Sequence, residues 1–127
     1  MIAVDTSALM AIVLREAAAA ACDERLDGEP EVLLSAGTVV EALVVAARRN
    51  VVAEMTRLLD GFGFDVVPVT LAAARRIGAA YARWGKGMHP AGLNFGDCFS
   101  YDVAKAHGCP LLFVGDDFSR TDVAPAL

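Results

Sequence analysis

The sequence Asn94-Phe95-Gly96-Asp97-Cys98-Phe99 predicts the start of a helix that runs to about His107 and carries a carboxylate in its first turn. Asn94 is a favourable N-cap residue, and an acid three positions later satisfies backbone N–H groups and the helix dipole. A purely structural role for Asp97 is therefore open. A functional role requires that carboxylates from distant parts of the chain also lie where strands end and helices begin.

Length and composition set the first limits on the class of protein. The 127 residues, 56% of them hydrophobic, predict one domain over residues 1–127 with a core that needs no disulfide or structural metal. Three cysteines without metal-ligand spacing (Cys22, Cys98 and Cys109) predict reduced, buried thiols. No apolar run is long enough for a membrane span, and no basic signal-peptide start is present, so we expect a cytoplasmic protein outside the membrane.

The charge balance narrows the possible partners. A formal net charge of -5 argues against a protein that holds nucleic acid by a broad basic surface. It leaves open an enzyme whose acids are neutralised by divalent cations when the substrate arrives.

Apolar strands alternate with helices along the chain. Apolar runs predict strands at 2–4, 32–34, 64–69 and 111–114, with a short edge strand near 122–123. Helical patterns occupy about 8–14, 16–26, 38–49, 50–60, 70–85 and 94–107, with Ser7, Asn50 and Thr70 as expected caps. Pro68 places the third strand's end or the sheet edge at that point. This alternation predicts an α/β domain of three layers, α/β/α, with a mainly parallel central sheet.

Four carboxylates follow this pattern of strand ends and helix starts. Asp5 ends the first strand, Glu41 lies in the first turns of the helix after the second, and Asp97 opens a late helix. Asp116 lies just beyond the last strand. In an open parallel sheet, ligands bind beyond the carboxyl ends of the strands, so all four acids are expected to face one edge. Each also has a structural alternative, such as a capping box from Thr38 to Glu41 or a turn at Asp116.

Acids gathered in one cleft repel one another unless a cation joins them. Oxygen ligands without nearby histidine or cysteine favour Mg²⁺ or Mn²⁺ over zinc. Such a site polarises a phosphate and activates water, as in two-metal phosphodiester cleavage, and Ser7 or Thr6 is placed to supply a supporting hydroxyl. The four acids together therefore predict a metal-dependent phosphodiester site.

Four segments together resemble the PIN domain of VapC-like toxins, in the expected order and over nearly the whole chain. They are Val4-Asp5-Thr6-Ser7-Ala8-Leu9, Thr38-Val39-Val40-Glu41-Ala42, Leu93-Asn94-Phe95-Gly96-Asp97-Cys98 and Leu112-Phe113-Val114-Gly115-Asp116-Asp117-Phe118. The resemblance implies a three-layer α/β/α PIN-like fold. It also implies a metal-dependent endoribonuclease that is the toxin of a toxin-antitoxin pair and hydrolyses RNA with metal-activated water.

The same resemblance implies residue roles and partners. Asp5, Glu41, Asp97 and Asp116 take the roles of catalytic, metal-binding acids, with Mg²⁺ or Mn²⁺ as the cofactor. Many relatives carry the fourth acid in a differently spaced turn, which would make Asp117 the ligand; Asp116 is preferred because it is nearer the strand end. The implied partners are an RNA substrate, a second copy of the chain in a homodimer, and a cognate antitoxin whose C-terminal segment fills the cleft.

Two other classes of protein are alternatives to a nuclease. A non-catalytic PIN-like binding module would need all four acids to be dispensable. A phosphoacceptor receiver domain would need an aspartate at the end of the middle strand and a lysine after the last one. Here the strand 66–69 ends in Thr70 and no lysine follows Val114, which ranks the receiver domain low.

Overall fold

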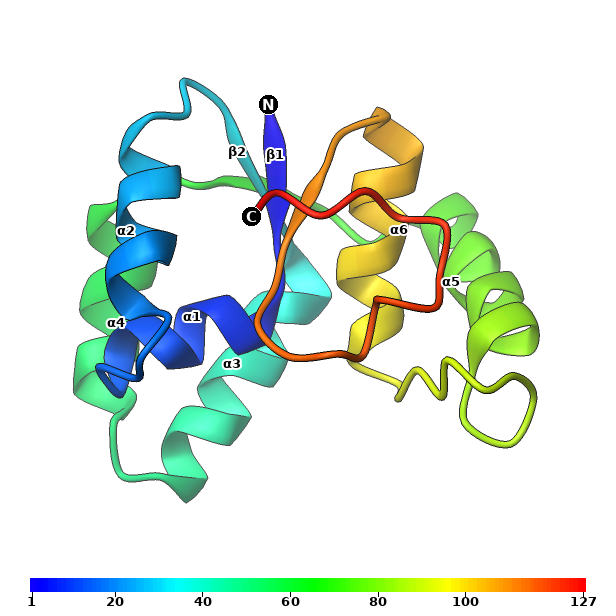
Figure 1. The fold of residues 1–127 in the computed structure, drawn as a ribbon, viewed down its shortest axis with the longest axis horizontal. Helices are drawn as coiled ribbons and strands as arrows, with labels where there is room; N and C mark the ends of the chain where they lie inside the picture. Colours follow the sequence, from blue (N-terminus) through cyan, green and yellow to red (C-terminus); the bar gives the residue numbers. More distant parts are fainter.

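The structure is a computed structural model that describes residues 1–127, and its ten elements follow the predicted alternation (Figure 1). The helices are α1 Thr6–Val13, α2 Ala19–Asp27, α3 Ala36–Arg48, α4 Val52–Gly61, α5 Leu71–Trp84 and α6 Asp97–His107. The strands are β1 Ile2–Val4, β2 Val32–Ser35, β3 Asp65–Val67 and β4 Leu111–Leu112.

The four strands form one parallel sheet in the order β3-β2-β1-β4. Ala3 in β1 is paired with Leu33 on one side and with Leu111 on the other, so β1 lies inside the sheet. The chain moves outward from β1 through β2 to β3 and then crosses back to place β4 on the free side of β1. Strand order therefore reverses between β1 and β4, which is where ligands of open parallel sheets bind.

Helices cover both faces of the sheet, because side chains alternate along each strand. Ile2 and Val4 face a core formed with α1 to α4, whereas Ala3 faces a second core formed with α5 and α6. In Figure 1 the sheet is seen nearly edge-on, with α1 to α4 on one side and α5 and α6 on the other. The predicted three-layer α/β/α arrangement with a parallel sheet is confirmed.

The two sheet edges end differently. β3 stops at Val67, just before Pro68, and is largely exposed, as the proline predicted. At the other edge the C-terminal tail runs beside β4: the Leu111 amide donates to the Ala124 carbonyl at 2.8 Å, and the Ala126 amide donates to the Leu111 carbonyl at 2.9 Å. The tail thus pairs at 124–126 through an isolated bridge, and the prediction of an edge strand at 122–123 was wrong in position and extent.

Several helix caps differ from the prediction. Asp5 caps α1 by accepting the Ser7 amide at 3.0 Å, so Ser7 is not the cap. Asn50 does not cap α4 either: its φ of 58° places it in the left-handed turn that follows α3. Asparagine adopts this conformation more readily than most residues, which explains both its place and the wrong prediction. Thr70 does cap α5, as predicted.

The cysteines and the helix lengths give two further results. All three cysteines are free, with Cys22 and Cys98 buried and Cys109 half-buried. None of the helices is both long enough and apolar enough to cross a bilayer.

Candidate metal-binding active site

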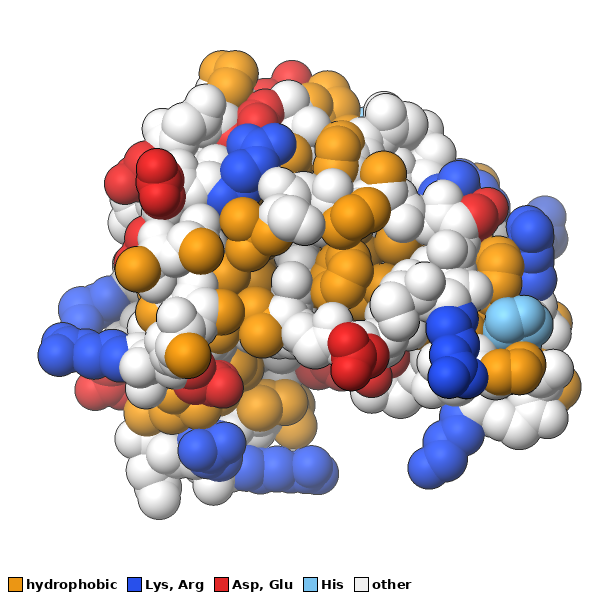
Figure 2. Space-filling model, viewed as in Figure 1, with side chains coloured by type: hydrophobic (Ala, Val, Ile, Leu, Met, Phe, Trp, Pro, Cys, Tyr) orange, Lys and Arg blue, Asp and Glu red, His pale blue; other side chains and the backbone are white.

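The site lies at the carboxyl edge of the sheet, where β1 and β4 separate. Asp5 directly follows β1, Asp97 is the first residue of α6, and Asp116 and Asp117 follow β4. Figure 2 shows acidic side chains gathered at the lower centre of the view, where Figure 1 places the loop after β4. The predicted convergence of strand ends and helix starts is therefore seen in the fold.

The Asp5 carboxylate is buried, with 3% of the residue exposed, and three hydrogen bonds hold it in one orientation. Its Oδ1 accepts the Ser100 hydroxyl at 2.5 Å, and its Oδ2 accepts the Ser7 hydroxyl at 2.7 Å and the Ser7 amide at 3.0 Å. The Ser7 hydroxyl in turn accepts the Val114 amide at 3.0 Å. The end of β4 is therefore linked through Ser7 to the carboxylate at the end of β1.

Asp97 and Asn94 form a reciprocal pair before α6. The Asn94 amide donates to Asp97 Oδ2 at 2.9 Å, and the Asp97 amide donates to Asn94 Oδ1 at 2.8 Å. The structural role foreseen for Asp97 is thus partly correct, although Gly96 rather than Asn94 occupies the N-cap position. The second carboxylate oxygen of Asp97 has no hydrogen bond in the structure, which leaves it available to a ligand.

Glu41 reaches the site from one turn into α3. Its Oε1 accepts the Thr6 hydroxyl at 2.5 Å, and its carboxylate lies where a Cβ on Gly96 would be. Only a glycine at position 96 lets the glutamate approach the start of α6 this closely. Ser35, not Thr38, caps α3, so the capping-box explanation of Glu41 was wrong. The Thr38 hydroxyl is fully buried and has no partner.

Burial and neighbouring charges raise the pKa values of acids at this site. Burial raises the pKa of Asp97 to about 7, and the charges of Asp5, Asp117 and Glu41 add to the rise against the Asn94 hydrogen bond. Burial likewise raises the pKa of Asp5, despite its bonds from Ser100 and Ser7. Burial and the charge of Asp5 raise the pKa of Glu41, although the Thr6 hydroxyl opposes this.

For the fourth acid, the charges that act on Asp97 point to Asp117 rather than to Asp116. Asp116 and Asp117 are both exposed in the turn after β4. The charge of Asp117 acts on Asp97, whereas Asp116 is not among the charges that do so. Sequence position relative to the strand end favoured Asp116. Gly115, with a φ of 102°, turns the chain sharply at this point, so distance along the sequence is a poor guide here.

The donor set suits a hard divalent cation. Every candidate ligand is a carboxylate oxygen, and hydroxyl groups of Thr6, Ser7 and Ser100 orient three of these oxygens from behind. The carboxylates are not drawn together into a ready-made ligand shell, since no three of them lie at metal-ligand spacing. Charged carboxylates this near one another repel, and a bound cation would remove the repulsion.

Ser100 is a residue of the candidate site that the sequence analysis did not identify. It is 1% exposed, and its hydroxyl fixes Asp5 from one turn after Asp97. Its signal was present in the sequence, because residues three apart lie on the same face of a helix. A serine on the buried face beside a candidate catalytic aspartate predicts a supporting hydroxyl.

Known proteins share both the sequence and the fold. The family model described as "PIN domain" matches residues 2–124. The chain is 43% identical to ribonuclease VapC42 of Mycobacterium tuberculosis over 97% of both chains, and 44% identical to ribonuclease VapC28 of the same species over 98% of this chain and 96% of that one.

Solved structures extend the comparison at lower identity. The crystal structure of Mycobacterium tuberculosis VapC20, described as a sarcin-ricin loop cleaving toxin, superposes with a TM-score of 0.79 at 20% identity, covering 98% of this chain and 97% of that one. A toxin-antitoxin complex from Klebsiella pneumoniae gives 0.69 at 20% identity, covering 96% and 93%. The acids of this chain thus occupy a fold and a sequence framework shared with named ribonucleases, and the chain belongs to the VapC ribonucleases of the PIN domain family.

Proposed function

We propose that this chain is an endoribonuclease that depends on Mg²⁺ or Mn²⁺ and acts as the toxin of a toxin-antitoxin pair. The observation that carries the proposal is the gathering of acids from separate segments at one edge of the sheet, where the charges of Asp5, Glu41 and Asp117 all raise the pKa of Asp97. Carboxylates gathered in a partly buried site repel one another in their charged forms, and a cation removes that repulsion. Because the proposed substrate is RNA, we also propose that the protein acts in the cytoplasm.

The acidic site consists of Asp5, Glu41, Asp97 and Asp117, and different contacts hold its members in place. Asp5 and Asp97 are both buried and held by hydrogen bonds, so they would be the fixed ligands, with Glu41 approaching from α3. We assign the fourth position to Asp117 in preference to Asp116. When bound, Mg²⁺ or Mn²⁺ would polarise the scissile phosphate and lower the pKa of the attacking water. The chain's own residues would orient the oxygens that hold it.

The serine and threonine hydroxyls would set the precision of the site. Ser7 and Ser100 leave Asp5 a single orientation, and Thr6 does the same for one oxygen of Glu41. Hydroxyls that donate to a carboxylate also favour its charged form, which keeps it able to bind a cation. These contacts would hold the acids ready before RNA arrives.

Cleavage of defined RNAs tests the nuclease. Purified protein is incubated with structured and unstructured RNAs in Mn²⁺, in Mg²⁺ or with chelator, and compared with Asp97→Asn and with Asp60→Asn on the exposed end of α4. We expect metal-dependent cutting by the wild type and the Asp60 variant, with loss in the Asp97 variant. Equal cutting by all three would mean a contaminating activity. If none cuts RNA and calorimetry detects no Mn²⁺ binding, a non-catalytic binding module is the better explanation.

We also propose an antitoxin protein and a second copy of the chain as partners. The fold shared with a toxin-antitoxin complex supports the first. The second is supported by α3, whose exposed face carries Val40 (62% exposed) and Val44 (48% exposed), with Phe95 (74% exposed) nearby. Apolar side chains gathered in this way mark an interface. Sedimentation of the wild type and of Val44→Asp tests the dimer, with Val52→Asp on α4 as the control; a monomeric wild type would refute it.

A further inference from the structure

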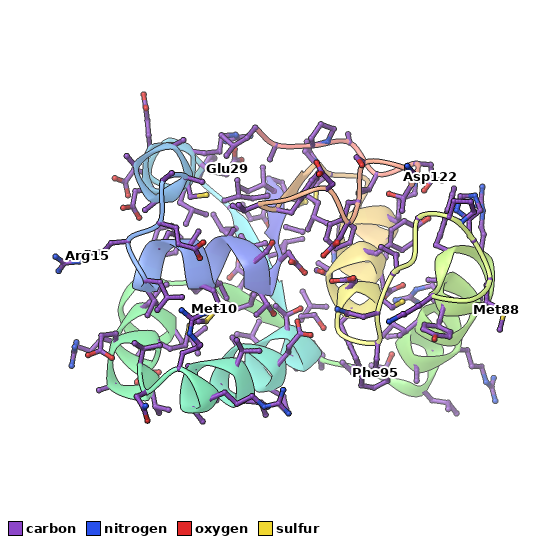
Figure 3. All side chains as sticks on the ribbon, turned by 60° about the horizontal axis from the view of Figure 1, so that its bottom comes forward. Met10, Arg15, Glu29, Met88, Phe95 and Asp122 are labelled. Atoms are coloured by element: carbon purple, nitrogen blue, oxygen red, sulfur yellow. The ribbon has the colours of Figure 1, made fainter.

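A groove of about 690 Å³ runs along α3 and opens beside the acidic site. One wall is a stripe of α3, and the other is formed by Val69 and by the turn that carries Phe95. Figure 3 shows Phe95 on that turn, before α6, beside the first turns of α3. The lining is mostly apolar, and its only charged residues are Glu41 and Arg48.

The order of these residues along α3 is acid, apolar, base. Glu41 lies near the start of the helix, Val44 near the middle, and Arg48 at the end. Arg48 follows Glu41 by seven positions, which is about 10 Å along a helix axis. Arg48 is exposed and forms no ion pair within its own chain, in contrast to Arg25, Arg76 and Arg83. Arg48 and Glu41 of one chain therefore line the same groove without forming an ion pair with each other.

This order is self-complementary. A symmetric contact between two copies pairs residue i of one with residue j of the other, and the reverse. If two α3 helices pack antiparallel about a two-fold axis at Val44, position 48 of one copy lies opposite position 40 of the other, next to Glu41. The apolar centres then cover each other, and each base lies against the partner's acid. A partner with any other charge order would leave Arg48 or Glu41 unmatched.

We propose that two copies pair through α3 and that Arg48 of each copy completes the active site of the other. The inference rests on the proposed ribonuclease function. Arg48 of the partner subunit would lie beside Glu41, where an RNA phosphate must approach a group of carboxylates. A guanidinium binds phosphate by two parallel hydrogen bonds and offsets the repulsion between phosphate and acids. A chain of net charge -5 needs such a local cation to hold RNA.

A cysteine on the axis tests the pairing without any assay of activity. Val44→Cys would face its own copy across the two-fold axis, within the reach of a disulfide. After mild oxidation we expect a covalent dimer on a non-reducing gel. The wild type, whose Cys22 and Cys98 are buried, and Val52→Cys, on a valine of similar exposure on α4, are expected to stay monomeric on the same gel. No cross-link at Val44, or an equal one at Val52, would overturn the pairing.

Mixing two impaired variants tests the catalytic role in trans. Arg48→Ala is expected to lower RNA cleavage about 100-fold, as loss of a preorganised charged donor does. Arg49→Ala, the neighbouring exposed arginine outside the groove lining, is expected to leave it unchanged. Arg48→Lys should keep part of the activity because it retains the charge.

The mixture of Arg48→Ala with Asp97→Asn is decisive. In a mixed dimer, the Arg48→Ala copy keeps its acids and receives the arginine of the other copy. Random pairing makes half of the dimers mixed, each with one complete site of two, so activity should recover to about a quarter of the wild-type value. Mixed dimers captured through a tag on one variant, but without recovered cleavage, would overturn the role in trans. A Val44→Cys cross-link in a wild-type protein that cuts no RNA would instead refute the ribonuclease function and leave the pairing intact.

Discussion

Replacing Asp97 by asparagine is expected to stabilise the metal-free protein at alkaline pH while abolishing its activity. In the folded protein the pKa of Asp97 is raised from 3.8 to about 7, with burial as the main cause. The folded chain therefore holds a proton that the unfolded chain releases between these values. Stability contributed by this group is fully present below pH 3.8 and is lost as the pH rises through 7. The loss has a ceiling of about 4 kcal/mol, because each pKa unit corresponds to about 1.4 kcal/mol.

Urea unfolding at pH 5 and pH 8.5, with chelator and with Mn²⁺, measures this effect. Without metal, the free energy of unfolding of the wild type should fall between the two pH values relative to that of Asp97→Asn. Asp60→Asn, on the exposed end of α4, should follow the wild type. Adding Mn²⁺ should stabilise the wild type more than Asp97→Asn, because the cation compensates the buried charge. The reasoning is refuted if the wild type and Asp97→Asn differ by the same amount at both pH values.

Three further substitutions test the supports around the acids and the packing of α5 on α6. Gly96→Ala should lower RNA cleavage about 100-fold, because the added Cβ would overlap the carboxylate of Glu41. Gly78→Ala is the control: its Cβ would meet no other atom, so RNA cleavage should be unchanged. Ser100→Ala should lower Mn²⁺ affinity about tenfold in calorimetry, as loss of a group supporting a metal ligand does; unchanged affinity would deny it that role. Trp84→Phe removes the 3.0 Å hydrogen bond to the Tyr101 hydroxyl and should lower the free energy of unfolding in urea by about 1 kcal/mol. The double variant with Tyr101→Phe should lose less than the sum of the two single losses, and additive losses would exclude the coupling.

The sequence predicted the strands, their parallel arrangement and the edge where the acids meet. Buried parallel strands read as short apolar runs, and Asp5 and Asp97 stand directly at element boundaries, so their positions follow from the chain order. Helix ends were harder to predict, because residues that favour caps also favour turns. Asn50 shows this: its preference for a left-handed turn resembles, in sequence, a preference for an N-cap.

Contacts between distant segments could not be predicted from local patterns. The spacing of three residues can place Ser100 beside Asp97, but its partner Asp5 lies 95 residues away, and only the folded chain brings the two together. The choice between Asp116 and Asp117 depends on a turn at Gly115 whose direction only the folded chain fixes. Which apolar helix face stays exposed is likewise decided by the fold: Leu9 and Met10 of α1 are buried in the core, whereas α3 carries exposed valines.

The position of β4 has a consequence for synthesis of the protein on the ribosome. β1 is the first strand made, yet its neighbour on one side is the last strand made. A nascent chain that stops before Leu111 already contains Asp5 and Asp97, but it lacks the Val114 amide that anchors Ser7 against Asp5. Such a chain keeps the bonds from Ser7 and Ser100 to Asp5, but the Ser7 hydroxyl is not yet held from the other side of β1. In this topology the last strand added to the sheet also supplies the final hydrogen bond behind the carboxylate that ends the first strand.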